Sequence, residues 1–196
     1  EISKYFLEVI LSMGFDNEAL KILMKKKNLR IIDISKYKSK NNLSIKGFDR
    51  SFIIQDKDEI QIGKKKLKCV TNLKPTKKEI NQVIFASNIC KYVKSNAIVL
   101  SNNFSTIGIG AGQPSRLDSC KIAVQKAKKF RPDKMKNSVA ASDAFFPFTD
   151  GVKTLIKSGV KIIVQPGGSI RDQEIINEAN RSKIKMLFTG TRHFNH

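Results

Sequence analysis

The sequence contains only three cysteines and two histidines, and this scarcity limits the kinds of site it can form. Cys69, Cys90 and Cys120 are far apart and include no pair with C-x-x-C spacing, which argues against a zinc site or a disulfide framework. An odd number of scattered cysteines is typical of a protein of the reducing cytoplasm. His193 and His196 are too few to bind a metal without other ligands.

Long apolar runs are also missing. No stretch of about 18 apolar residues occurs, so the sequence contains no candidate transmembrane helix. No signal peptide is visible at the start, and the first residue is Glu1 rather than Met, which leads us to expect a segment of a longer chain. The 196 residues suffice for one domain or slightly more, and a hydrophobic content of 40% can supply a core.

Acidic residues are few: 17 stand against 37 basic residues, which gives a formal net charge of +20. Such an excess is a possible signal of nucleic-acid binding. However, only seven of the basic residues are arginine, the residue best suited to read phosphates and base edges. We interpret the charge as lysines spread over solvated faces by A/T-rich codon usage. Weak, salt-sensitive attraction of polyanions remains the alternative.

The first 74 residues predict short elements. Asp16 is suited to cap a helix, because a side-chain oxygen just before a helix accepts hydrogen bonds from its first amides. A polar stretch, 36–50, predicts a linker or a surface excursion. Short strands are expected over residues 6–11, 29–34, 51–55 and 66–70.

After Pro75 the pattern becomes regular. Three segments place Ser or Thr three residues before an acid, which is the capping-box pattern of a helix start, and each precedes an apolar pattern of helical period. These pairs are Thr76 and Glu79, Ser115 and Asp118, and Ser169 and Asp172. Apolar strands are expected between them over 97–100, 106–109, 160–164 and 185–188, with a turn at Asn102-Asn103. The alternation of strands and helices predicts an α/β layered fold.

Two glycine-rich turns precede predicted helices. Residues 108–113 read Gly-Ile-Gly-Ala-Gly-Gln and lack the third glycine of a dinucleotide fingerprint, because Gln113 stands there. The turn is either a flexible connection or a binding loop, and the cap at Ser115 places Arg116 and Leu117 in the first helical turn, where polar or anionic ligand groups are favoured. Residues 166–170, Pro-Gly-Gly-Ser-Ile, show the same arrangement of a glycine turn before a helix. They either form a second binding loop or are simply a good helix start.

An aromatic segment and the chain end complete the set of motifs. Residues 143–150 read Asp-Ala-Phe-Phe-Pro-Phe-Thr-Asp, and residues 191–196 read Thr-Arg-His-Phe-Asn-His. The three phenylalanines would ordinarily be core residues, and Pro147 favours extended backbone before it. Asp150 could simply cap a helix that starts at Gly151.

Together with 94–98, Lys-Ser-Asn-Ala-Ile, these motifs resemble the C-terminal part of the transformylase domain in the AICAR transformylase/IMP cyclohydrolase family. The similarity in order and spacing covers nearly the whole chain. It implies a cytidine-deaminase-like, three-layer α/β/α fold within a duplicated domain. Residues 1–40 would end the first half, 41–74 would form a connecting segment with short strands, and 75–196 would form most of the second half. The zinc-deaminase signature is absent, so deaminase chemistry does not follow.

The resemblance also implies an activity and a set of binding residues. The family transfers a formyl group from 10-formyltetrahydrofolate to the 5-amino group of AICAR during IMP biosynthesis. Asn96 would orient AICAR and Arg192 would meet its phosphate, while the pair at 116–117 would contact the folate from the neighbouring subunit. The matching AICAR residues are Glu8, Asn96, Phe145 and Arg192, and the matching folate residues are Arg116, Leu117, Asp150, Ser169 and Ile170.

The sequence lacks the family's central acid–base pair. The amine of AICAR is a poor nucleophile, so the transfer needs a general base and stabilisation of the tetrahedral oxyanion. The family supplies these chiefly through adjacent Lys and His residues in the first half of the domain, and no Lys-His pair occurs here. We therefore expect this chain to carry binding residues but not to catalyse the reaction alone. We also expect these residues to lack the family's cyclohydrolase domain.

Smaller departures from the family pattern are Met13 in place of proline, Arg50-Ser51 in place of two glycines, and Thr149 in place of a common arginine.

The resemblance further implies a cytosolic homodimer with shared active sites, no catalytic metal, no membrane association and no specific nucleic-acid partner. The alternatives are a truncated relic that only binds ligand and a basic nucleic-acid-binding protein.

Overall fold

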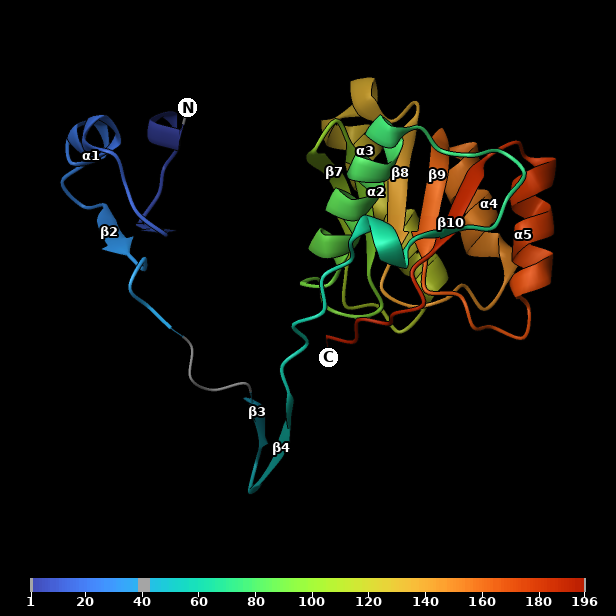
Figure 1. Cartoon of the computed structure of the whole chain (residues 1–196), viewed down its shortest axis with the longest axis horizontal. Coiled ribbons are helices and arrows are strands. Elements are labelled where there is room, and N and C mark those ends of the chain that lie inside the picture. Colours follow the sequence, from blue (N-terminus) through green and yellow to red (C-terminus); the bar gives the residue numbers. More distant parts are fainter. Residues whose placement is uncertain (1, 39–42, 196) are drawn as a thin grey trace. The chain divides into compact units, whose positions relative to one another are not determined.

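The computed structural model describes residues 2–38 and 43–195, which divide into two compact units, Glu1–Lys57 and Asp58–His196 (Figure 1). In the first unit a 3-10 turn, Ile2–Lys4, precedes strand β1, Val9–Ser12, helix α1, Asn17–Leu23, and strand β2, Arg30–Asp33. Strands β1 and β2 pair in parallel. Asp16 caps α1 as predicted, because its Oδ1 accepts a hydrogen bond of 2.7 Å from the amide of Ala19.

Two predictions for the first unit need correction. The buried strand expected over 6–11 begins only at Val9, and Phe6 is 88% exposed, because the two-stranded sheet leaves it without a covering layer within this unit. The polar stretch 36–50 is not all linker: β3, Leu43–Phe48, pairs antiparallel with β4, Ser51–Asp56. Residues 39–42 lie outside the described residues. Apolar and polar side chains alternate in β3, so pairing with β4 outweighs the polar composition.

The second unit is a mixed α/β structure built on one six-stranded sheet (Figure 1). The strand order is β5-β10-β9-β8-β6-β7, with β8, β9 and β10 parallel and the other pairings antiparallel. The strands are β5 Lys68–Cys69, β6 Ile98–Asn102, β7 Ser105–Gly110, β8 Ser138–Ser142, β9 Val160–Gln165 and β10 Lys185–Phe188. The helices are α2 Lys77–Cys90, α3 Arg116–Phe130, α4 Thr149–Lys157 and α5 Asp172–Arg181, with 3-10 turns at Lys64–Lys66 and Pro132–Lys134.

Helices cover both faces of this sheet. Successive residues of β6 show the division, because Ile98 and Leu100 pack in the cluster formed by α3, α4 and α5, whereas Val99 packs against α2. All five residues of β8 are buried, as expected for a central strand. The predicted α/β layered fold is confirmed at this level. Within the described ranges, no helix is long and apolar enough to cross a membrane.

Of the three helix caps predicted after Pro75, two form. Thr76 and Glu79 make a full capping box at the start of α2, and Ser115 Oγ accepts a hydrogen bond from the amide of Asp118 at the start of α3. The cap predicted at Ser169 is wrong, because α5 begins only at Asp172. There Asp172 Oδ2 accepts a 2.6 Å hydrogen bond from the Gly168 amide, which closes the glycine turn before the helix starts.

The remaining differences concern short elements. Strand β8 was not predicted, because the small residues Ser-Val-Ala-Ala-Ser give little apolar signal. The β6–β7 turn lies one residue later than predicted, at Asn103 and Phe104, both with φ near +50° (48° and 57°). Helix α4 begins at Thr149 rather than Gly151, and Phe148 at its N-cap provides no side-chain hydrogen bond.

Candidate active site

A cavity of about 520 Å³ opens in the second unit between the start of α3 and the segment joining β8 to α4. Six of the nine predicted site residues line it: Asn96, Arg116, Leu117, Phe145, Asp150 and Arg192. Phe146, Phe148 and Phe194 add apolar surface to the same walls. The cavity therefore brings together three of the four residues expected for the ribotide and three of the five expected for the folate.

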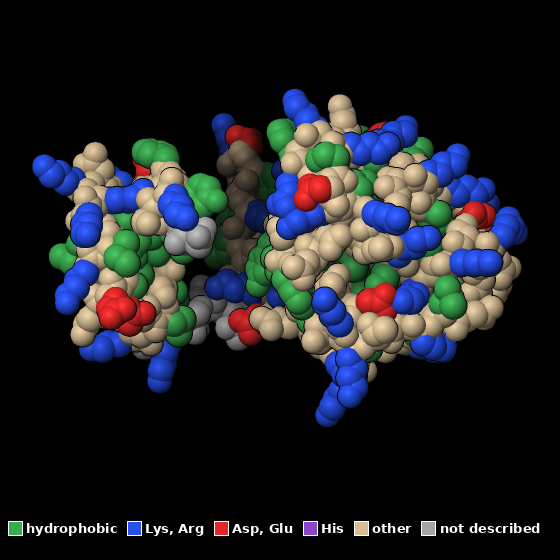
Figure 2. Space-filling model, turned by 90° about the horizontal axis from the view of Figure 1, so that it is seen from above, with side chains coloured by type: hydrophobic (Ala, Val, Ile, Leu, Met, Phe, Trp, Pro, Cys, Tyr) green, Lys and Arg blue, Asp and Glu red, His purple; other side chains and the backbone are tan. Residues whose placement is uncertain are grey.

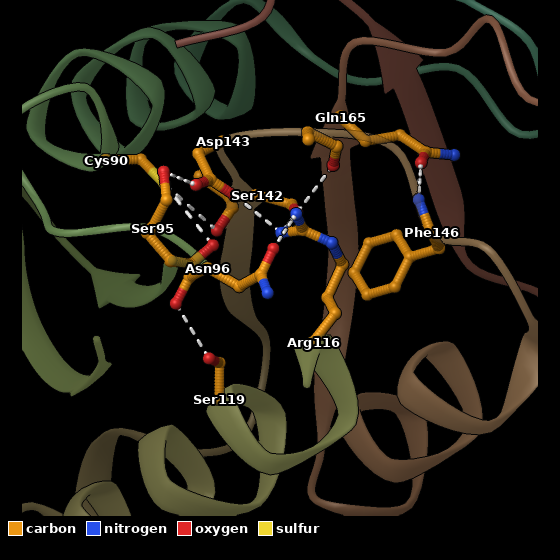
Figure 3. Close-up of polar contacts among 12 residues, drawn as sticks. Cys90, Ser95, Asn96, Arg116, Ser119, Ser142, Asp143, Phe146 and Gln165 are labelled. Atoms are coloured by element: carbon orange, nitrogen blue, oxygen red, sulfur yellow. Dashed lines mark hydrogen bonds and ion pairs between the residues drawn. The ribbon is translucent and has the colours of Figure 1, made fainter. Parts of the chain in front are cut away.

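A buried ion pair forms one wall of the cavity (Figure 3). Arg116 Nη1 donates to Asp143 Oδ1 at 2.5 Å and to Ser142 Oγ at 2.8 Å, and its Nη2 donates to Asn96 Oδ1 at 2.7 Å. Both charged side chains are buried, so each needs the other to compensate its lost hydration. The guanidinium of Arg116 is therefore engaged with internal partners.

Asn96 is fixed in orientation by the same wall. Its Nδ2 donates to the carbonyl oxygens of Gln113 and Pro114, at 2.9 and 3.2 Å, while its Oδ1 accepts from Arg116. Its main-chain oxygen accepts a 2.7 Å hydrogen bond from Ser119 Oγ. The last residue of the glycine-rich segment 108–113 and the proline that follows it thus supply the carbonyl groups that hold a predicted site residue.

Asp143 links this wall to the chain end, a role that sequence reasoning missed. Its Oδ2 accepts a 2.6 Å hydrogen bond from Ser95 Oγ, and its main-chain oxygen accepts one of 3.0 Å from the His193 amide. The signal available in the sequence was an acid directly after the apolar–small segment that forms β8, next to the aromatic run.

The three phenylalanines have different environments. Phe146 is a core residue, 1% exposed, and its amide donates to Gln165 Oε1 at 2.7 Å. Phe145 is half-buried at the cavity wall, and the guanidinium carbon of Arg192 lies 4.9 Å from its ring centre. Phe148 is 52% exposed. The ordinary core interpretation therefore holds for only one ring of the three.

The glycine turn at 166–168 lies beside Arg192. A Cβ atom added at Gly168, where φ is +90°, would stand 3.7 Å from Arg192 Nη2. At Gly167, with φ of +75°, a Cβ would meet the ring of Phe188 at 2.4 Å, which no real side chain permits. Glycine at 167 is therefore required for the turn to approach β10 and the segment after it.

Three predicted residues do not line this cavity. Ile170 is fully exposed (101%) and Ser169 is half-buried on the turn before α5, where Ser169 Oγ accepts from the Arg171 amide at 3.1 Å. Glu8 belongs to the first unit, is exposed, and borders a separate cavity of about 510 Å³ that Arg30 also lines.

Asp150 lines the cavity from the first turn of α4. Its carboxylate is exposed, and Oδ1 accepts a 2.6 Å hydrogen bond from the amide of Gly151. Asp150 therefore lies inside the first turn of α4 and is not its N-cap, which is Phe148. Its exposure leaves the other carboxylate oxygen accessible to a ligand.

Neither thiol near the site is suited to act as a nucleophile. Burial raises the pKa of the Cys120 thiol to about 12, even though the positive charge of Arg116 opposes this shift. Burial likewise raises the pKa of Cys90, with a smaller contribution from the Asp143 carboxylate. Both therefore remain thiols at neutral pH. Across residues 2–38 and 43–195, no group of three or more His, Cys, Asp or Glu side chains is arranged to hold a metal ion.

Comparisons with known proteins agree with these observations. Bifunctional purine biosynthesis protein PurH of Aquifex aeolicus is 43% identical over 196 residues, and PurH of Clostridium kluyveri is 46% identical over 196 residues. Each alignment covers 100% of this chain but only 38% and 37% of the relative, so the chain spans less than two fifths of these proteins' length.

The solved structure of a diaminohydroxyphosphoribosylaminopyrimidine deaminase/5-amino-6-(5-phosphoribosylamino)uracil reductase from Thermotoga maritima gives a TM-score of 0.35 at 15% identity. The alignment covers 53% of this chain and 33% of that one. A likeness at this level carries no argument about the present protein. The family model described as AICARFT/IMPCHase bienzyme matches residues 1–126, and with the identities above it shows that the chain belongs to the AICARFT/IMPCHase bienzyme family.

Proposed function

We propose that this chain provides ligand-binding residues of a formyltransferase that transfers a formyl group from 10-formyltetrahydrofolate to the 5-amino group of AICAR, in the last steps of IMP biosynthesis. The observation that carries the proposal is the contact between Arg192 and Phe145 in a cavity that also includes Asn96. These three side chains come from distant parts of the sequence, and each has a distinct use in binding a ribotide.

The chemistry of each group matches one part of AICAR. The half-buried face of Phe145 suits a flat aminoimidazole ring, while the exposed guanidinium of Arg192 can make paired, charge-assisted hydrogen bonds to a phosphate monoester. Asn96 is held rigidly by its neighbours and forms a fixed polar edge beside the ring. For Glu8 the assignment as an AICAR-binding residue rests on the family resemblance alone.

The folate is assigned to the start of α3 and to the turn before α5. Leu117 and Asp150 offer apolar and charged surface in the cavity, whereas the guanidinium of Arg116 is already engaged and can act on a ligand mainly by fixing this wall. Ser169 and Ile170 lie outside the cavity, and the complete exposure of Ile170 suits a role at a partner's surface. We accordingly propose a homodimer with shared active sites.

Catalysis requires groups that this chain lacks. A Lys-His pair is absent from the sequence, and the buried thiols of Cys90 and Cys120 cannot replace a general base. The buried side chain of His193 contacts Asp58 and does not line the cavity. We propose that acid–base chemistry is supplied by a preceding half of the domain, with residues 1–40, 41–74 and 75–196 forming its end, a connection and most of a second, cytidine-deaminase-like half. The cyclohydrolase activity would reside in a separate domain.

The distribution of charge is the observation that bears on the nucleic-acid alternative. Figure 2 shows Lys and Arg side chains scattered over the visible face of the second unit rather than gathered in one stripe. A scattered charge gives weak, sequence-independent attraction that salt removes. We propose a cytosolic enzyme whose partners are small molecules and a second copy of the chain.

A titration distinguishes the proposal from its alternatives. The protein, in a form that contains all segments found in its relatives, is titrated with AICAR and with a folate analogue by calorimetry, and separately with random-sequence DNA at increasing salt. We expect saturable binding of both small molecules and DNA binding that disappears at physiological salt. Saturable, sequence-selective DNA binding without AICAR binding would contradict the proposal. If both small molecules bind but a transformylase assay on the same protein shows no turnover, the alternative of a truncated relic that only binds ligand would be favoured.

A further inference from the structure

His193 is a buried residue that the proposed chemistry does not use. Its side chain is 5% exposed, and Nδ1 lies 2.5 Å from Asp58 Oδ2, a residue 135 positions earlier. Nε2 is buried and has no partner among the described residues. Lys91 Nζ lies 3.8 Å from Asp58 Oδ1 and donates to the carbonyl of Ile60, so the carboxylate sits between two donors.

Around His193, where the chain forms no helix or strand, burial alternates along the sequence. Arg192 borders the cavity and His193 points into the interior, while Phe194 borders the cavity again. This alternation is typical of extended backbone, in which successive side chains point to opposite sides. Docking of His193 therefore determines on which side its neighbour, Arg192, is presented.

Hydrogen bonds of the main chain also hold this segment, at His193 itself and at Asn195. The His193 amide donates to the carbonyl of Asp143 at 3.0 Å. The Asn195 amide donates to Ser95 Oγ at 3.2 Å, and the Ser95 amide donates to the carbonyl of Asn195 at 2.9 Å. A chain end normally frays unless such contacts tie it down. The side-chain contact with Asp58 adds a further anchor, to a loop 135 positions earlier in the sequence.

The contacts continue into the cavity wall. Ser95 Oγ donates to Asp143 Oδ2, and Asp143 Oδ1 accepts from Arg116, which in turn holds Asn96 (Figure 3). The docked tail and the wall that carries Asn96 thus share one connected set of hydrogen bonds. A change in the tail is expected to be felt first at Arg192, which is bonded directly to His193, rather than at the more strongly held Asn96.

We propose that His193 is a positioning residue: its imidazole, docked on Asp58, holds the tail so that Arg192 stays over Phe145 and is aimed at a ribotide phosphate. The ligand named here rests on the proposed function, whereas the docking of the tail does not. Asp58 is 36% exposed in its side chain, so its carboxylate can regain water when the imidazole is removed. Loss of His193 should therefore free the tail without unfolding the unit.

The first test measures the tail directly in this chain. Amide hydrogen exchange is followed by NMR for His193 and Asn195, with Thr189, whose amide donates to the carbonyl of Gln165, as the reference. In His193→Leu we expect exchange at 193 and 195 to accelerate by at least about tenfold while Thr189 is unchanged. His193→Asn, whose amide can donate where Nδ1 does, should restore most of the protection.

The second test measures the effect on binding in a form that contains all segments found in the relatives. His193→Leu should weaken AICAR binding by about tenfold, while affinity for a folate analogue stays within about twofold, and His193→Asn should recover most of the loss. Asp58→Ala should cause a similar loss, and the double variant should add little to either single change. Ile184→Val, a conservative change at a buried site away from the tail, is the matched control and should leave both affinities unchanged.

Two outcomes overturn the inference. One is exchange at 193 and 195 that stays at the parental rate in His193→Leu. The other is equal weakening of AICAR and folate binding in His193→Leu with no recovery in His193→Asn, which is the pattern of general destabilisation. Failure of the parent to bind AICAR would instead contradict the proposed function, and the exchange data would then decide the docking of the tail alone.

Discussion

The guanidinium carbon of Arg192 lies 4.9 Å from the centre of the Phe145 ring, within the distance of a cation–π contact. Arg192 is exposed and follows the glycine turn and β10, whereas Phe145 follows β8. The contact places a positive charge and an aromatic face side by side at the rim of one cavity. The proposed ribotide site would use both groups, because a ribotide combines a flat ring with a phosphate.

Substitutions at Phe145 and Phe146 should affect different properties: the first ligand binding, the second the stability of the fold. Phe146→Ala removes a fully buried ring, so we expect unfolding to become easier by about 3–5 kcal/mol. Phe145→Leu keeps apolar volume but loses the aromatic face, so stability should change little and AICAR binding should weaken by about 0.5–1.5 kcal/mol. Urea unfolding and calorimetry measure the two quantities. Unchanged AICAR affinity in Phe145→Leu would remove this ring from the proposed site.

The contribution of Glu79 to stability should depend on pH. Burial by itself raises the pKa of the Glu79 carboxyl, but the hydrogen bond from Lys185 and those from Thr76 outweigh it, so the pKa is lowered. A lowered pKa in the folded state means that the stabilisation is present above the unfolded value, about pH 4.3, and is lost as pH falls through the folded value.

Glu79→Gln removes this dependence. The difference in unfolding free energy between parent and variant should be largest near neutral pH and should shrink as the pH falls below about 4. Denaturant unfolding across this range measures it, with Glu174→Gln, a change at an exposed surface pair, as the control. A difference that grows on acidification would show that the sign of the shift is wrong.

The isolated chain should not catalyse formyl transfer, because it carries no Lys-His pair. A transformylase assay on the purified chain is expected to give only the background rate. Adding the preceding half of the domain from a relative should raise the rate if the two parts assemble. Turnover by the chain alone, if it survives stringent purification and is abolished by Asn96→Ala, would contradict this expectation.

Local patterns in the sequence predicted the elements that depend on local physics. The caps at Asp16, Thr76 and Ser115 form, because each hydrogen bond joins residues only three positions apart. The cap predicted at Ser169 was wrong, and the cause is also local. The side chain of Asp172 accepts a hydrogen bond from the Gly168 amide, and the helix begins only at Asp172. Strand β8 was missed because its small residues owe their burial to both neighbouring strands rather than to their own hydrophobicity.

The network behind the cavity could not be predicted in this way. Asp143 joins Ser95 across 48 positions, and His193 joins Asp58 across 135. Neither pair has a spacing that a helix or a hairpin would impose, so only the folded chain reveals them. The family resemblance did group six residues of one cavity, yet it did not indicate which of their side chains are engaged with internal partners, as that of Arg116 is.

The central claim, that this cavity binds a ribotide through Arg192, is tested most directly by calorimetry of AICAR binding to the parent and to Arg192→Ala. The protein should contain all segments found in its relatives, and Arg171→Ala, which removes the guanidinium over the ring of Phe148 instead, serves as the matched control. We predict that Arg192→Ala weakens AICAR binding by at least about 1.5–3 kcal/mol, the scale of a hydrogen bond to a charged group, and weakens folate binding much less. Equal AICAR affinities in Arg192→Ala and the parent would contradict the account.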